Sequence, residues 1–309
     1  MNRRTFIQVT AAAAGLAATG RADGESLARR EFKEGVRLSV IGFGGIVVCG
    51  MPQDEADRTV AEAFDRGVNY FDVAPSYCDG EAETKLGPAL GPLRQRSFLA
   101  CKTLERDAAG ARRELERSLA RLRTDHFDLY QFHAVSSLED VDKIVGPGGA
   151  GETFLKARQE GKVRFMGASL HNAEAGIALM DRFPLDSVLF PVNFVLFQEG
   201  KFGPQILEHA RTKGIARLAL KTLAHQAWPD GADRSAWPKC WYQPIVDPAL
   251  AEKSVRFTLS EDVTAAIPPG EAKLFRLALD CGGRFRPLSP TERRDLLESA
   301  RGLSPIFRA

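Results

Sequence analysis

Tyr70-Phe-Asp-Val-Ala-Pro-Ser-Tyr77, followed by Gly80-Glu-Ala-Glu-Thr-Lys-Leu-Gly87, is the stretch that decides how the chain folds. The apolar run beginning at Val68 predicts a buried strand, which ends on the carboxylate of Asp72. Five residues further on, a loop presents the phenol of Tyr77. The stretch therefore places two ionisable groups just beyond the end of one strand.

Two further polar residues close the next two strand-like runs. Lys102 ends the first run and His133 ends the second. Taken singly, each polar residue has a structural explanation: Asp72 as a helix cap, Tyr77 as a rim aromatic, Lys102 as a surface charge and His133 as a core histidine. A carboxylate, a phenol, an ammonium and an imidazole at three successive strand ends favour a proton-transfer site.

The rest of the chain alternates between strand-like and helix-like segments. The clearest helix follows Asp107, where apolar residues recur at intervals of three and four. We expect strands at 36–45, 68–72, 98–102, 127–132, 163–169, 187–190, 215–221 and 263–267. We expect helices at 54–67, 81–90, 107–122, 151–160, 172–183, 203–213, 248–260, 271–280 and 289–302, the last capped by Ser289 with Pro290 as its first residue.

Eight strand–helix alternations predict an α/β fold of the TIM-barrel type, a single-domain (β/α)8 barrel with a C-terminal helix, rather than an open sheet. In such a barrel the carboxyl ends of the strands share one face. Asp72, Lys102 and His133 would then converge there.

The composition is that of a globular enzyme. The chain has 309 residues, 44% hydrophobic and 27% charged, with a formal net charge of +2. No basic stripe indicates a nucleic-acid partner. No stretch approaches the roughly 20 apolar residues that a membrane-spanning helix needs, so we expect no stable membrane insertion.

The N-terminal 22 residues have a separate character. Arg3-Arg4 precede an alanine-rich, weakly apolar run from Val9 to Thr19, and Gly20-Arg-Ala22 is a candidate cleavage site. The pattern predicts an export signal over 1–22 and resembles a twin-arginine signal; a frayed helical N-terminus is the alternative. We therefore expect recognition by the export machinery, a periplasmic or other extracytoplasmic location, and a barrel over 23–309.

The five cysteines specify neither a disulfide nor a metal site by their spacing. They are Cys49, Cys78, Cys101, Cys240 and Cys281, with no CxxC pair. We expect Cys101 to pack outward from its strand as a small apolar residue. Cys78, next to Tyr77, is either a bystander, which is the favoured interpretation, or a reactive thiol near the site.

These motifs together resemble those of the aldo-keto reductase family. The resemblance runs from Ile41-Gly-Phe-Gly-Gly45 through residues 67–72 and 80–87 to the Lys102 and His133 strand ends and Gly167-Ala-Ser169. It implies reduction of a small-molecule aldehyde or ketone, or a sugar-derived carbonyl, by hydride transfer from NADPH.

The resemblance also implies a role for each polar residue. Tyr77 would be the general acid that protonates the carbonyl oxygen. Lys102 would lower the pKa of Tyr77, Asp72 would hold Lys102, and His133 would orient the carbonyl.

The cofactor half departs from the family pattern. Gly44 and Ser169 match, and Asn193 is a substitute amide donor for the expected Gln, whose position Leu189 takes. Lys221 stands at the end of a strand, where it could contact the cofactor pyrophosphate or an anionic substrate, or simply be solvated. Leu220, before it, replaces an aromatic that often stacks on nicotinamide.

The segment expected to hold the adenosine phosphate also differs. Glu271 would repel a 2′-phosphate, while Lys273 and Arg276 would partly compensate, so the cofactor is NADP(H) or NAD(H), with a slight preference for NADP(H). An insert from Trp228 to Tyr242 holds all three tryptophans, which either stack on a sugar or apolar substrate or only pack a long loop.

Two other functions remain open at this point. One is a barrel enzyme that holds its nicotinamide cofactor tightly, or has lost it, and acts on a sugar. The other is a non-catalytic binding barrel. The complete set of Asp72, Tyr77, Lys102 and His133 argues against the binding barrel, because binding alone has no need of that arrangement.

Overall fold

The computed structural model describes residues 27–309, and the predicted export signal lies outside them. Within this range an eight-stranded parallel sheet forms a barrel, with the strands in sequence order around it. The ring closes where Gly42 N donates to Ala266 O and Ala266 N donates to Val40 O, each at 2.9 Å. The strands are β3 (Phe43–Gly44), β4 (Tyr70–Asp72), β5 (Phe98–Thr103), β6 (Phe127–Val135), β7 (Val163–Leu170), β8 (Ser187–Pro191), β9 (Ala216–Leu220) and β12 (Ala265–Ile267).

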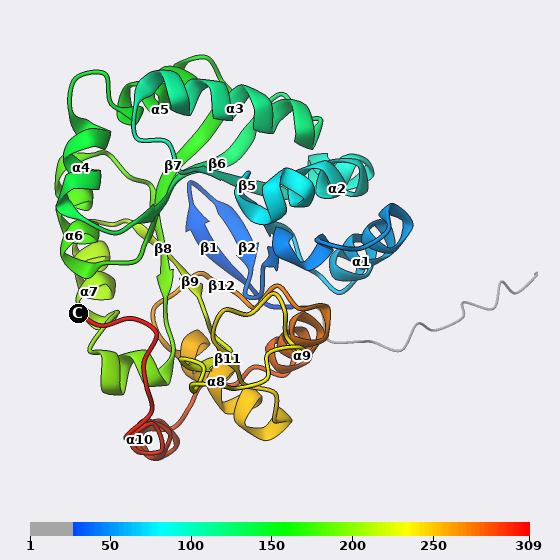
Figure 1. Ribbon diagram of the computed structural model, residues 1–309, viewed down its shortest axis with the longest axis vertical. Coiled ribbons are helices and arrows are strands. Elements are labelled where there is room, and N and C mark those ends of the chain that lie inside the picture. The colour runs from blue at the N-terminus through cyan, green and yellow to red at the C-terminus, as the bar shows by residue number, and fades with distance from the viewer. Residues whose placement is uncertain (1–26) are drawn as a thin grey trace, which may run out of the picture.

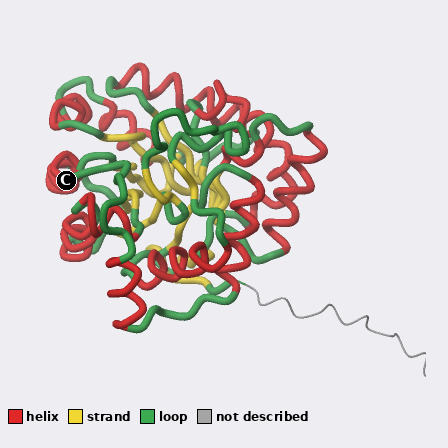
Figure 2. The backbone as a smooth tube through the Cα atoms, turned by 60° about the horizontal axis from the view of Figure 1, so that its bottom comes forward, coloured by secondary structure: helices red, strands yellow, loops and turns green. Residues whose placement is uncertain are grey.

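Helices surround the ring of strands, as Figures 1 and 2 show. They are α1 (Gln53–Asp65), α2 (Glu81–Leu90), α3 (Ala108–Leu122), α4 (Leu138–Val145), α5 (Ala150–Gln159), α6 (Ala173–Arg182), α7 (Pro204–Thr212), α8 (Pro248–Ser260), α9 (Ala272–Gly283) and α10 (Pro290–Glu298). No described helix is long and apolar enough to cross a membrane. The (β/α)8 architecture predicted from the alternating segments is confirmed.

Alternation along the strands creates two apolar cores, because successive side chains point to opposite faces. Tyr70, Phe98, Leu129, Phe165 and Leu218 belong to a cluster inside the barrel. The larger cluster fills the space between the strands and the helices, and it contains the buried Cys101, as expected.

The amino ends of the strands are covered by a hairpin of β1 (Arg29–Lys33) and β2 (Val36–Ser39). Its Phe32 meets the rings of Phe98 and Phe165 edge-on, with centroids 5.2 and 5.4 Å away. Figure 1 shows this hairpin, in blue, within the ring of strands. The inner core is thereby sealed at one end, and the carboxyl ends are left for a site.

The structure corrects three local predictions. The single strand expected over 36–45 divides into β2 and β3, because β2 turns back on β1 to form the hairpin. Helix α4 was not expected, although Ser137 caps it by accepting from Asp140 N. The last helix ends at Glu298 rather than at 302, but its start at the Ser289 cap is confirmed.

The inner core generates a stability prediction. Phe165→Ala should lower the free energy of unfolding by about 3–5 kcal/mol, because it opens a cavity among closely packed rings. Leu155→Ala on α5 is the matched control; its side chain is 42% exposed, and its effect should stay within about 0.5 kcal/mol. Urea unfolding of both variants measures the difference, and equal effects would contradict the packing described here.

Candidate active site

The strand ends bring the four predicted polar residues to one cavity. Asp72 ends β4, Lys102 lies near the end of β5, His133 lies near the end of β6, and Tyr77 opens the short helix η2 (Tyr77–Gly80). The cavity is lined by Gly44, Ile46, Asp72, Tyr77, Lys102, His133, Ser169, His171, Leu220, Lys221, Lys239, Trp241, Tyr242, Ile267, Pro268, Pro269 and Gly270. Predictions drawn from four separate segments thus meet in one place.

A buried ion pair lies at the bottom of this cavity. Lys102 Nζ donates to Asp72 Oδ1, and both side chains are almost inaccessible to water. The other carboxylate oxygen of Asp72 accepts from Gln131 Nε2 at 2.9 Å and from Tyr70 OH at 3.3 Å. These contacts satisfy a buried carboxylate and fix the position of the ammonium.

Tyr70 and Gln131 are site residues that the sequence analysis did not single out. Tyr70 lies two positions before Asp72 on β4, and Gln131 lies two positions before His133 on β6. Residues two apart on a strand face the same side. This periodicity is the signal that would have identified them.

Tyr77 lies next to the ammonium. Its phenol oxygen accepts from Lys102 Nζ at 3.1 Å, and the same nitrogen lies 5.0 Å from the centre of the Tyr77 ring. The loop that carries the tyrosine leaves β4 through a turn in which Tyr77 N donates to Ala74 O at 3.0 Å. The three side chains form a continuous chain from phenol to ammonium to carboxylate.

The direction of the Tyr77 pKa differs from the expectation. Burial raises the pKa of the phenol above its ordinary value of 10.0, and the attraction of Lys102 only partly offsets this. Lys102 itself is pulled in two directions: burial alone would lower its pKa, but Asp72 and Tyr77 raise it. At neutral pH both groups therefore carry their protons, which is the state that a proton donor requires.

His133 lies against the same tyrosine and is held neutral. Its ring meets the ring of Tyr77 edge-on at 5.7 Å, and its Nδ1 lies 3.4 Å from Ser76 Oγ. Burial lowers the pKa of His133 well below its usual value, and the charge of Lys102 lowers it further. A neutral imidazole keeps one N–H for a ligand oxygen without carrying a charge.

Three of the predicted cofactor residues line the cavity. Gly44 lies close to Ile267, where an added Cβ would approach the isoleucine methyl to 3.1 Å. Ser169 Oγ accepts from Ala134 N at 2.7 Å, which leaves its hydroxyl hydrogen free to donate to an amide oxygen. Lys221 follows directly after β9.

Lys221 has an unusual backbone conformation for a residue with a side chain. Its φ is 64°, in the left-handed region, and its carbonyl accepts from Asn193 Nδ2 at 3.0 Å. Among the described residues no carboxylate acts on its ammonium, which lies 4.9 Å from the Tyr242 ring centre and 5.2 Å from that of Trp241. Burial lowers the Lys221 pKa to about 8. Such a cation is suited to an anionic ligand.

The other three predicted cofactor residues do not line the cavity. Asn193 uses its amide within the protein, since its Oδ1 also accepts from Leu196 N at 2.9 Å. It therefore fixes the backbone of Lys221 instead of facing a ligand. Arg276 forms a two-nitrogen pair with Glu62, with its closest contact at 2.8 Å, and Lys273 is exposed on α9.

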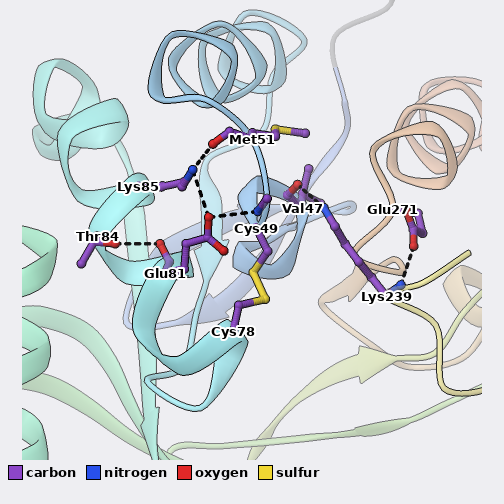
Figure 3. Close-up of a disulfide and its surroundings, with 10 residues drawn as sticks. Val47, Cys49, Met51, Cys78, Glu81, Thr84, Lys85, Lys239 and Glu271 are labelled. Atoms are coloured by element: carbon purple, nitrogen blue, oxygen red, sulfur yellow. Dashed lines mark hydrogen bonds and ion pairs between the residues drawn. A yellow bond between two sulfur atoms is a disulfide. The ribbon is translucent and has the colours of Figure 1, made fainter.

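The tryptophan-rich insert covers one side of the cavity. It is flanked by the short paired strands β10 (Ala224–Gln226) and β11 (Gln243–Pro244). Lys239 Nζ donates to Val47 O at 3.0 Å, which ties the insert to the helix η1 (Gly45–Val48), and Lys239 N donates to Glu271 (Figure 3). Trp241 is 53% exposed, so the insert supplies both packing and an open aromatic face.

The structure gives Cys78 a state that neither interpretation of it included. It forms a disulfide with Cys49 (Figure 3), and it directly follows Tyr77, which lines the cavity. Cys101, Cys240 and Cys281 are free and buried. Because 29 residues separate the bonded pair, the spacing alone gave no indication of the bond.

The fold and the cavity define a (β/α)8 barrel with ionisable side chains gathered at the carboxyl ends of its strands. The profile of the Aldo/keto reductase family matches residues 40–239, and the chain belongs to that family.

Three relatives illustrate the similarity. L-galactose dehydrogenase of Arabidopsis thaliana is 29% identical over 62% of this chain and 63% of its own. Aldo-keto reductase YhdN of Bacillus subtilis is 31% identical over 61% of this chain and 60% of its own. The matches thus span less than two thirds of either relative. The solved aldo-keto reductase AKR11C1 from Bacillus halodurans, at 23% identity, shares the fold over 91% of this chain and 98% of its own, with a TM-score of 0.70.

Proposed function

We propose that the protein reduces an aldehyde or ketone to an alcohol with a nicotinamide dinucleotide, and that Tyr77 donates the proton. The observation that carries the proposal is the chain from the Tyr77 phenol through Lys102 to Asp72, which ends in the cavity. Family membership supports the same chemistry.

The residues present fit a nicotinamide cofactor at its reactive end. Ser169 would offer a hydroxyl hydrogen to the carboxamide, and Lys221 would offer a charge to the pyrophosphate. Gly44 lines the same cavity without a side chain. The cofactor supplies the hydride when it is bound.

The chain's own residues handle the proton. The Tyr77 phenol gives its proton to the carbonyl oxygen as negative charge develops there, and the resulting phenolate lies beside the Lys102 ammonium. Asp72 keeps that ammonium in place. His133, uncharged, donates a hydrogen bond to the same oxygen and orients the substrate.

The substrate class follows from the rim of the cavity. Trp241 exposes an aromatic face, and Tyr242 lines the wall beside it. Aromatic faces stack on the apolar faces of sugar rings. One relative is a dehydrogenase of a sugar, L-galactose. We therefore propose a sugar-derived carbonyl compound as the substrate.

The choice of cofactor depends on the segment that begins α9. Glu271, the residue expected to repel a 2′-phosphate, accepts from Lys239 N at 2.7 Å, while Arg276 is occupied by Glu62. Both features reduce the slight preference for NADP(H) drawn from the sequence. We propose that NADH binds at least as tightly as NADPH.

The role of Tyr77 can be tested by substitution. Tyr77→Phe should lower kcat for carbonyl reduction by about 10²- to 10⁴-fold and leave dinucleotide binding unchanged, because only the proton donor is lost. The measurement is NADPH or NADH oxidation with a panel of aldoses and short aldehydes.

Tyr130→Phe is the matched control for this experiment. The Tyr130 hydroxyl is buried outside the cavity and has no hydrogen-bond partner among the described residues. Its removal should leave kcat unchanged. Wild-type turnover in Tyr77→Phe would refute the proposed mechanism.

The role of Lys221 predicts a pH dependence of binding. A pyrophosphate prefers the protonated lysine, so the dinucleotide Kd should rise as the pH passes through about 8, the pKa of the free protein. Calorimetric titration with NADH and NADPH between pH 6.5 and pH 9.5 measures this effect and the cofactor preference together.

Lys221→Met should weaken dinucleotide binding and abolish its rise in Kd with pH. Lys156→Met, at an exposed position of α5, is the control and should behave as the wild type. An unchanged pH profile in Lys221→Met would show that the lysine does not contact the cofactor.

We also propose that the protein is exported to the periplasm. The Arg3-Arg4 pattern motivates this, and the Cys49–Cys78 disulfide supports it, since disulfides persist in oxidising compartments. A periplasmic fraction should contain a chain that begins near Ala22 or Asp23, as read by N-terminal sequencing. An uncleaved chain in the cytoplasmic fraction would contradict export.

A further inference from the structure

The disulfide joins two segments that border the cavity. Cys78 directly follows Tyr77, and Cys49 directly follows η1, whose Ile46 lines the cavity. The two Cα atoms are 6.3 Å apart, so the bond bridges neighbouring segments of the rim. The residue proposed as proton donor is therefore one peptide bond from a covalent cross-link.

The backbone after Tyr77 adopts conformations that need an external restraint. Cys78, Asp79 and Gly80 have φ values of 51°, 53° and 88°, three successive residues in the left-handed region. Only glycine adopts this region readily, and the two residues before it carry side chains. Strained segments persist only where their surroundings over-determine them.

The far end of this segment is fixed by packing. A Cβ added to Gly80 would clash with Arg121 Nη1, so the backbone lies directly against the guanidinium. Arg121 is itself held by the buried carboxylate of Glu83 at 3.1 Å. This contact restrains Gly80, and the disulfide restrains Cys78 beside the tyrosine.

The segment that carries Cys49 is held in place by hydrogen bonds to its neighbours. Val47 O accepts from Lys239 Nζ, and Gly50 N donates to Glu81 Oε1 at 3.1 Å (Figure 3). Lys85 donates to Met51 O and pairs with Glu81 at 3.0 Å. Cys49 thus belongs to a stretch that is tied both to the insert and to α2.

We propose that the Cys49–Cys78 disulfide is the element that positions Tyr77 against Lys102, so that proton donation depends on the oxidised state of this pair. The proposal rests on the proposed reductase function, in which Tyr77 is the proton donor. It assigns Cys49 and Cys78 a positioning role; neither sulfur takes part in the reaction.

Reduction of the bond is chemically accessible from one side. Cys78 is exposed and Cys49 is buried, so a thiolate of a dithiol reductant attacks Cys78 Sγ and releases Cys49 as its thiolate. The second thiol of the reductant then closes on its own sulfur and releases Cys78. The protein gains two electrons and two protons, and the reductant leaves as a disulfide.

The first experiment compares oxidised and dithiothreitol-reduced protein, the double variant Cys49→Ser/Cys78→Ser, and the control Cys281→Ser, which removes a buried free thiol. Reduction, or the double substitution, should lower kcat by about 10²-fold with dinucleotide Kd within twofold, because a displacement of about 1 Å at the reacting group has an effect of this size. Cys281→Ser should behave as the wild type in both redox states, and the double variant should not respond to dithiothreitol.

A second measurement reads Tyr77 without turnover. The chain has four tyrosines, and burial raises the pKa values of Tyr70, Tyr130 and Tyr242 well above 10. Tyr77 is therefore the first phenol to ionise, and the Tyr77→Phe difference in absorbance at alkaline pH isolates it. Reduction of the Cys49–Cys78 disulfide should expose the Tyr77 phenol and move its pKa toward 10.

The outcomes separate this proposal from the reductase proposal. If the oxidised protein turns over no carbonyl compound but reduction still shifts the Tyr77 titration, the reductase proposal fails. The positioning role of the disulfide then stands. An unchanged kcat and an unchanged Tyr77 titration in reduced, folded protein would overturn the proposal that the disulfide positions Tyr77. Five free thiols in freshly purified protein, or zinc held by Cys49, Cys78 and Glu81, would overturn it as well.

Discussion

The buried ion pair between Lys102 and Asp72 is the constraint on which the site depends. Two charges removed from water are stable together only when their remaining hydrogen-bonding groups find partners. Tyr70 and Gln131 serve the carboxylate, while the free side of the ammonium reaches Tyr77. The remaining hydrogen-bonding capacity of the Lys102 ammonium is thus directed at Tyr77, the residue that we propose as the proton donor.

The barrel brings these side chains together because its parallel strands end on one face. Parallel strands end on the same face, so carboxylate, ammonium and imidazole arrive from β4, β5 and β6 without long loops. The opposite end is sealed by the β1–β2 hairpin, whose Phe32 packs on the inner core. The cavity that holds the ionisable groups lies at the carboxyl face.

Much of this site was predictable from the sequence because its residues end strands. Asp72, Lys102 and His133 close apolar runs, and the alternation of segments fixes the face on which they meet. The two-residue period of a strand places Tyr70 and Gln131 on the same face as Asp72 and His133. Their role as hydrogen-bond donors to Asp72 is visible only in the structure.

Other features depend on distances that no sequence pattern expresses. The disulfide joins residues 29 positions apart, and the amide of Asn193 turns inward to the backbone of Lys221. The direction of the Tyr77 pKa is a balance between burial and one nearby charge, and the balance is visible only in three dimensions. The pairing of Arg276 with Glu62 likewise requires α1 and α9 to be side by side.

The most direct test of the account follows an atom from cofactor to product. The protein is incubated with a sugar-derived aldehyde and NADH or NADPH that carries deuterium on either face of nicotinamide C4, and the alcohol is analysed by mass spectrometry. The account predicts one deuterium on the former carbonyl carbon from one face only. Cofactor binding with no alcohol formed, or an alcohol without deuterium from either face, would contradict it.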